Sequence, residues 1–184
     1  MDIAEIVQDA KEHILKEGEH RPMLYIEFEE KEVNLVAFAD FPYKTTLEKQ
    51  KAFFAIGRKL GEESPGKEIR QIIFIVEAWA SSYKAGEPRP DVSPSKDPNR
   101  KEVLMINVLD ADTSTRELKL STHLVEMLRD GSGALVDLLH HRSEQLEVTG
   151  SPLLTSMLAG FLSTKLSERE LARIVRKALR KSRE

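Results

Sequence analysis

The feature that most constrains the fold is an uninterrupted apolar run near the middle of the chain, residues 72–76, which reads Ile-Ile-Phe-Ile-Val. β-Branched and aromatic side chains favour a strand, and successive side chains on a strand point to opposite faces. A continuous run therefore needs cover on both faces of its sheet. The run continues into Glu77-Ala78-Trp79. The sequence predicts a central strand over residues 70–80.

Other segments alternate between apolar and polar residues, as strands with one buried face do. We expect them over residues 23–29, 33–39, 103–109, 116–129 and 134–141. The last two are joined by Asp130-Gly131-Ser132-Gly133, which is a strong signal for a β-hairpin. The alternative for this region is a pair of short helices, over residues 122–130 and 134–146.

Helical spacing and capping signals predict four helices. The first covers residues 2–17 and ends at Gly18. A capping box at Thr45 and Glu48 opens the second, which runs to about Leu60 and is closed by Gly61 and residues 64–66. We expect its buried side chains to be Leu47, Phe53 or Phe54, Ile56 and Leu60. The third begins at Ser151-Pro152, and a second capping box at residues 167–170 opens the last.

These segments predict one α+β domain over residues 1–184. Its order is α-β-β-α-β-β-β-β-α-α, a mostly antiparallel sheet of about six strands with flanking helices, which we expect on one side of the sheet. A chain of 184 residues suits a single domain.

Composition narrows the class of protein. The chain has no cysteine, so disulfides, thiolate metal ligands and thiol nucleophiles are excluded, and a reducing cytoplasm is the expected location. No apolar run approaches the ~18 residues of a membrane span, and the N-terminus has no secretory pattern. Few Asn and Gln beside abundant Glu, Arg and Lys are typical of thermophilic proteins.

Charge is divided unevenly along the chain. Residues 1–32 carry ten acids and four bases, a net charge of −6, whereas residues 165–184 carry eight bases and three acids, a net charge of +5. The two ends can attract one another within a chain or between chains, so we expect a homo-oligomer. The basic C-terminal helix lacks interleaved aromatics and the whole chain is acidic, so we do not expect nucleic acid as a partner.

The candidate ligand-binding residues lie around the end of the central strand. Glu77 is a carboxylate on a strand that needs cover on both faces, so its pKa rises or it finds a cation. The loop over residues 82–101 carries four of the eight prolines, and its end could bring Arg100 or Lys101 near Glu77 if the flanking strands are antiparallel neighbours. Either an ion pair anchors the loop, or the end of the sheet binds a ligand. The candidates are Glu77, Trp79, Asp97, Arg100 and Glu102.

Part of this region resembles a known group. The segment Ile73-Phe-Ile-Val-Glu77-Ala-Trp79, followed by Pro94-Ser95-x-Asp97-Pro98-x-Arg100-x-Glu102, is similar to a recurring signature of uncharacterised prokaryotic proteins, over roughly residues 70–140. The resemblance implies no activity, and it favours strands over residues 103–141.

No intact catalytic motif is present, and we expect no cofactor and no metal site. The leading hypothesis is a non-enzymatic binding or assembly protein. The alternative is a metal-dependent hydrolase or nuclease using Glu77, Asp91, Asp97 and Glu102, so the sequence leaves open whether the chain is an enzyme.

Overall fold

The computed structural model describes residues 2–38, 45–81, 94–112, 117–141, 152–167 and 169. The predicted α+β class and the order of its elements are confirmed. The elements are α1 (Ile3–Glu17), β1 (Met23–Phe28), β2 (Val33–Ala37), α2 (Thr46–Glu63), β3 (Ile69–Ala80), the 3-10 turn η1 (Pro94–Lys96), β4 (Lys101–Asp112), β5 (Glu117–Arg129), β6 (Leu135–His141) and α3 (Pro152–Leu162). The basic C-terminal helix, predicted over residues 165–184, lies mostly outside the described residues, as does most of the loop over residues 82–101.

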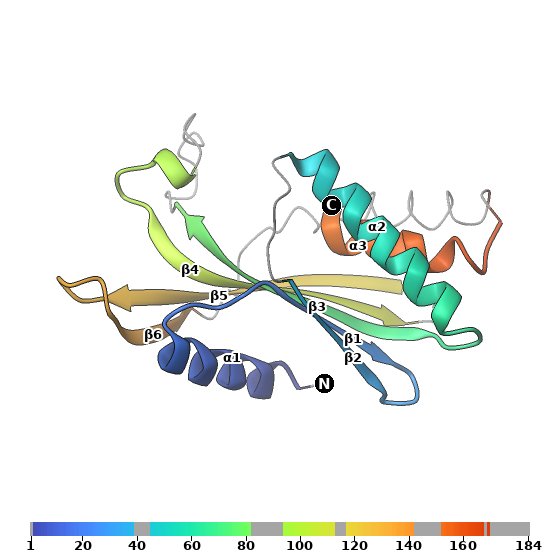
Figure 1. Cartoon of the computed structure of the whole chain (residues 1–184), viewed down its shortest axis with the longest axis horizontal. Helices are drawn as coiled ribbons and strands as arrows, with labels where there is room; N and C mark the ends of the chain where they lie inside the picture. Colours follow the sequence, from blue (N-terminus) through green and yellow to red (C-terminus); the bar gives the residue numbers. More distant parts are fainter. Residues whose placement is uncertain are drawn as a thin grey trace.

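The six strands form one antiparallel sheet in the order β2-β1-β3-β4-β5-β6 (Figure 1). The apolar run lies on β3, one of the two central strands, as its composition predicts. The hairpin between β5 and β6 is confirmed, and the helical alternative is wrong. Its turn is held by the Asp130 carboxylate, which accepts hydrogen bonds from the amides of Ser132 (2.8 Å) and Ala134 (3.0 Å).

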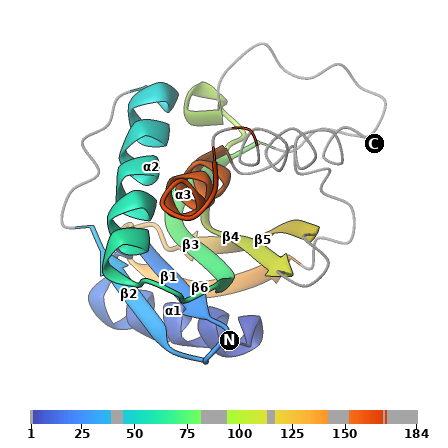
Figure 2. The same ribbon diagram turned by 90° about the vertical axis from the view of Figure 1, so that its right-hand side faces the viewer.

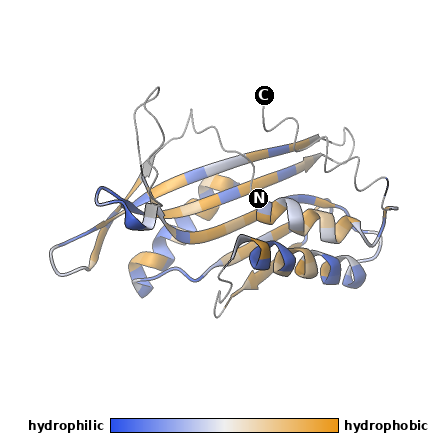
Figure 3. Ribbon diagram, turned by 90° about the horizontal axis from the view of Figure 1, so that it is seen from above, coloured by the Kyte–Doolittle hydropathy of each residue, from blue (hydrophilic) through white to orange (hydrophobic). Residues whose placement is uncertain are grey.

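Helices cover both faces of the sheet, so the expectation that they lie on one side is wrong. Helix α1 lies across one face, whereas α2 and α3 lie on the other (Figures 1 and 2). On β3, Ile73 and Ile75 join the core under α1, while Ile72 and Phe74 join the core under α2 and α3. The apolar residues on the central strands are evident in Figure 3. An apolar strand of this kind cannot leave either face in water, which is the physical reason for the second layer.

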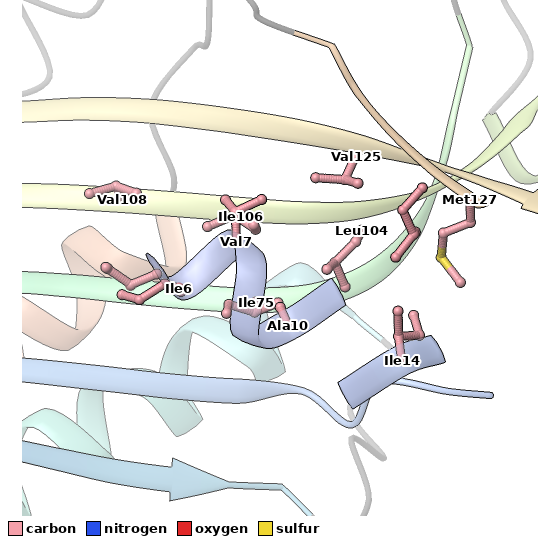
Figure 4. Close-up of a cluster of buried hydrophobic side chains, with 12 residues drawn as sticks. Ile6, Val7, Ala10, Ile14, Ile75, Leu104, Ile106, Val108, Val125 and Met127 are labelled. Carbon is pink, nitrogen blue, oxygen red and sulfur yellow. The ribbon is translucent and has the colours of Figure 1, made fainter. Parts of the chain in front are cut away.

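The α1 layer follows the periodicity of its sequence. Asp2 caps the first turn by accepting the Ala4 amide (2.9 Å), and Gly18 ends the helix in a left-handed conformation. The buried stripe of Ile6, Val7, Ala10 and Ile14 packs on β3, β4, β5 and β6 (Figure 4). The C-terminal end of α1 therefore approaches the sheet where β3 ends and β4 begins.

The α2 and α3 layer differs from prediction in its contacts. The Thr45–Glu48 capping box is present, but Leu47 is 59% exposed, and Gly61 lies inside the helix and does not close it. The face of α2 that meets α3 carries Phe53, Gly57 and Gly61. The two glycines have no side chain, so the two helix backbones come close together. The contact therefore depends on close backbone packing and not on a stripe of apolar side chains. Among the described residues, no helix combines the length and the apolar character that crossing a membrane requires.

Candidate functional site

The candidate site lies at the end of the sheet where β3 ends and β4 begins. Trp79 is paired with Glu102 across the two strands, and Glu77 is paired with Leu104. Because side chains alternate along a strand, Glu77 and Trp79 lie on the same face as Ile73 and Ile75, which is the face that α1 covers. Figure 4 shows Leu104, Met127 and Ile14 close to one another at this end of the core. The polar residues of the site follow directly beyond this apolar cluster.

Glu77 joins the sheet to the segment that follows α1. Its side chain is half-buried, and its Oε1 accepts a hydrogen bond from the backbone amide of His20 at 2.5 Å. Burial raises the pKa of the Glu77 carboxyl, the His20 amide lowers it, and the nearby charges of Glu102 and Arg129 oppose one another. Desolvation is the largest of these effects. The Glu77 carboxyl therefore fastens the backbone of the α1–β1 connection to the end of β3.

Glu102 is held by a guanidinium from β5. Arg129 donates from Nε to Oε2 of Glu102 at 2.6 Å and from Nη2 to Oε1 at 2.9 Å. The same guanidinium donates from Nη1 to the carbonyl of Gly133 in the β5–β6 turn, at 3.2 Å. A bidentate pair of this geometry fixes both side chains. Arg129 thus ties the start of β4 to the hairpin that follows it.

Trp79 and Arg100 form a cation–π pair at the rim of the site. The indole is 44% exposed, and the Arg100 guanidinium carbon lies 4.5 Å from the ring centroid. Arg100 is itself anchored, because its Nη1 donates to the carbonyl of Ser95 at 2.9 Å. A large, exposed aromatic is thereby presented on a rigid strand beside a fixed guanidinium.

Asp97 organises the turn that carries Arg100. Its Oδ1 accepts the backbone amide of Asn99 at 2.8 Å, and its carbonyl accepts the amide of Arg100 at 3.2 Å. The hydroxyl of Ser81 and then the Asn99 amide keep the pKa of the Asp97 carboxyl below its ordinary value. Ser81 directly follows β3, so the influence of its hydroxyl on Asp97 places this carboxylate near the end of β3. Its role in the structure is to shape the turn before β4.

All five candidate residues therefore meet at one end of the sheet, but their partners differ from the prediction. The cation beside Glu77 is Arg129, and not Arg100 or Lys101, the two that the sequence offers as candidates. Arg100 lies on Trp79, and Lys101 pairs with Glu126 at 2.8 Å. Glu126 is paired with Val103, so alternation places it on the face opposite Glu77.

Sequence reasoning missed two members of the site, Arg129 and His20. Arg129 stands immediately before the Asp130 turn, and its contact with Glu102 depends on the β4–β5 register, which the residues around Arg129 do not reveal. His20 contributes a backbone amide, which any residue other than proline carries. His20 is only 4% exposed, and its ring meets that of His13 edge to face at 5.5 Å. Burial lowers the pKa of the His20 imidazole, and the charge of His13 lowers it further by a smaller amount.

The site offers few groups for acid–base or metal chemistry. Glu77, Asp97 and Glu102 each accept hydrogen bonds from within the chain, and Asp91 lies outside the described residues. In the described part of the chain, no group of three His, Asp or Glu residues has a geometry suited to a metal ion. What the arrangement does present to solvent is the Trp79 ring and the Arg100 guanidinium.

Comparisons with known proteins identify no relative. No family model matches the chain, no curated protein matches its sequence, and no solved structure matches its fold. The resemblance noted over residues 70–140 therefore stays a prediction.

Proposed function

We propose that this chain is a non-enzymatic binding and assembly protein whose contact surface for a protein partner is centred on Trp79 and Arg100. The observation that carries the proposal is the exposed indole held under an anchored guanidinium at the sheet end. Tryptophan and arginine are the residues most enriched among those that dominate binding energy at protein interfaces. The cytoplasmic location that we propose rests on the cysteine-free composition.

Trp79 and Arg100 are held in place before any partner binds, which supports a contact surface more strongly than exposure alone does. Arg100 is fixed by the Ser95 carbonyl, and the turn that carries it is fixed by Asp97. Trp79 is on β3, which is hydrogen-bonded to its neighbour β4 in the sheet. Side chains held in one geometry before binding lose less conformational entropy when the partner arrives. The carboxylates around them have partners within the chain, which suits a scaffold that supports the contact surface.

The proposal is tested by selecting a display library of random peptides on the wild-type protein alone and then measuring the enriched peptides on wild type and on Trp79→Ala. Binding is followed by the anisotropy of a labelled peptide, because Trp79 is the chain's one tryptophan and the variant has no indole fluorescence. We expect selected peptides to bind Trp79→Ala about thirtyfold or more weakly, which corresponds to roughly 2 kcal/mol.

The matched control is Leu47→Ala, which removes an exposed side chain from α2 and should leave peptide binding unchanged. Peptides that bind both variants equally, or no enriched peptide at all, would contradict the Trp79 surface. A saturable rise in melting temperature with Mg²⁺, Mn²⁺, Ca²⁺ or Zn²⁺ that Glu77→Ala abolishes would instead favour a metal-dependent enzyme. An ion at 100 times its dissociation constant would add ~2.7 kcal/mol to stability.

A further inference from the structure

The two edges of the sheet differ in how they are protected. An edge strand exposes backbone amides and carbonyls on one side, and proteins guard such edges with charges, prolines or bulges. The edge strand β6 has such a guard, because Asp137 Oδ1 accepts the amide of Leu138 at 2.7 Å and the pairing with β5 shifts register between Leu128 and Arg129. The other edge strand, β2, reads Val-Asn-Leu-Val-Ala and contains no charge, no proline and no register shift against β1.

Among the described residues no strand pairs with the outer side of β2, and the hydrogen-bond pattern shows which of its residues face that side. The amide of Phe38 donates to the carbonyl of Pro22 (3.0 Å), and the amide of Phe28 donates to the carbonyl of Glu32 (2.9 Å). Antiparallel pairs alternate between bonded and non-bonded positions, so Asn34 and Val36 bond to β1. The backbone groups of the remaining three residues, Val33, Leu35 and Ala37, therefore point away from β1.

The same three residues also carry exposed side chains. Val33 is 44% exposed and Leu35 is 53% exposed, and both lie on the face that α1 covers only in part. The outward-facing residues are spaced symmetrically about Leu35. A two-fold axis at Leu35 would pair Leu35 with its copy and Val33 with Ala37 of the second chain. Every outward amide and carbonyl of β2 would then have a partner, and the apolar side chains would pack against their copies.

We infer that β2 binds β2 of a second copy of this chain, in antiparallel register about Leu35, to form one continuous sheet across a symmetric dimer. The inference gives the assembly part of the proposed function a defined interface. It favours a second copy over an unrelated strand because the open edge is uncharged and self-complementary. It does not involve Trp79, which lies at the far end of β3 on a different part of the sheet.

The first test is the oligomeric state, measured by light scattering on wild-type protein and on two matched variants. Leu35→Lys places a charge at the centre of the proposed interface, whereas Leu139→Lys places one on the guarded edge, where Leu139 is 49% exposed. We expect a wild-type dimer, a monomeric Leu35→Lys protein and a dimeric Leu139→Lys protein. A monomeric wild type, or a Leu35→Lys protein that stays dimeric, would overturn the inference. Circular dichroism of both variants establishes that they are folded.

The second test addresses the register. Because the chain has no cysteine, a single introduced cysteine can form a disulfide only with its copy in another chain. Two residues paired directly across antiparallel strands have Cα atoms about 5.5 Å apart, which is within the range of a disulfide. Leu35→Cys should therefore cross-link on mild oxidation, whereas Val33→Cys, which would face Ala37 of the second chain, should not. Cross-linking of Val33→Cys as fast as Leu35→Cys would overturn the register. Trp79→Ala should dimerise normally, so failure of the Trp79 surface and failure of this interface are distinguishable.

Discussion

At the scale of single residues, the candidate site depends on one guanidinium that serves two acids. Arg129 holds Glu102 through two hydrogen bonds and lies near Glu77, and the Arg129 and Glu102 side chains are only 28% and 21% exposed. Arg129→Ala leaves two partly buried carboxylates near each other without their cation. We expect it to lower the free energy of unfolding by about 1–2 kcal/mol, measured by urea denaturation.

The control for Arg129 is an ion pair in open solvent. Lys59 and Glu63 on α2 lie 3.7 Å apart with side chains 75% and 61% exposed. Exposed pairs contribute little because water screens the charges and the side chains lose entropy on pairing. Lys59→Ala should therefore change stability by less than about 0.5 kcal/mol. Equal losses in the two variants would mean that the Arg129 pair is also an ordinary surface contact.

A second residue-scale prediction concerns pH. The pKa of His20 lies below its ordinary value of 6.5 in the folded protein, because the ring is buried and faces His13. The unfolded chain thus binds more protons than the folded one as the pH falls through 6.5, and stability falls with it. Glu77 acts in the opposite sense, since its raised pKa costs stability as the pH rises above its ordinary value of 4.5.

The His20 contribution is isolated by comparing wild type with His20→Gln. This variant retains the backbone amide that donates to Glu77, and it leaves unchanged both His13, which acts on the ring of residue 20, and the charges of Glu19, Glu102 and Arg129 that act on Glu77. Urea denaturation at about pH 7.5 and about pH 5.5 brackets the ordinary imidazole pKa. We expect wild type to lose more stability than His20→Gln between the two. The same loss in both proteins would show that His20 does not titrate in a buried environment.

At the scale of elements, the contact between α2 and α3 depends on the absence of side chains. A Cβ at Gly160 would overlap the carbonyl oxygen of Phe54, lie 2.9 Å from the Phe54 carbonyl carbon and lie 3.0 Å from the Arg58 nitrogen. These are backbone atoms of α2, so the helices would have to separate. We expect Gly160→Ala to cost about 2–3 kcal/mol in urea denaturation.

The matched control is Gly131→Ala in the β5–β6 turn, where an added Cβ has no heavy atom within 4 Å among the described residues. It should leave stability within about 0.5 kcal/mol of wild type. If Gly160→Ala were as stable as Gly131→Ala, the two helices would not be in close contact in solution.

Local sequence signals do not predict the contact between α2 and α3. The periodicity of α1, the Thr45 capping box and the Asp130 turn are local signals, and each predicts its element correctly. Local preference predicts that Gly61 ends the helix, because glycine destabilises helix interiors by about 1 kcal/mol. In the structure α3 lies against that glycine, and a packing partner distant in the sequence outweighs the local preference. Leu47 is predicted to be buried because it is apolar, but an apolar residue does not specify which surface it meets, and in the structure Leu47 is exposed.

The candidate site shows the same division. The sequence predicts a mostly antiparallel sheet, and in the structure the antiparallel pairing of the strands that carry Glu77 and Glu102 brings the five candidate residues to one end of the sheet. Which cation meets which carboxylate depends on the register of β5 against β4, so the sequence alone does not identify Arg129. The amide of His20 carries no sequence signal at all. Strand order therefore predicts where the site lies, whereas the residues that bind its carboxylates depend on the tertiary structure.

At the scale of the whole molecule, two cores share the central strands. Ile73 and Ile75 on β3 belong to the core under α1, and Ile72 and Phe74 belong to the core under α2 and α3. Successive residues in this part of β3 therefore belong to different cores, one on each face of the sheet. Loss of either layer exposes one face of β3 and β4, so the layers should unfold together.

We therefore predict that a core substitution on one face of the sheet also destabilises the layer on the other face. Phe161 of α3 is 1% exposed, and Phe161→Ala should cost about 3–5 kcal/mol. Trp79 lies on the opposite face and reports by fluorescence, while circular dichroism reports on all elements. If unfolding is cooperative, Phe161→Ala shifts both transitions by the same denaturant concentration. A Trp79 transition that stays at its wild-type midpoint, while the circular dichroism transition moves, would mean that the α1 layer holds the sheet on its own. Ile14→Ala, which removes a fully buried side chain from the α1 core, gives the reciprocal experiment and should likewise move both signals together.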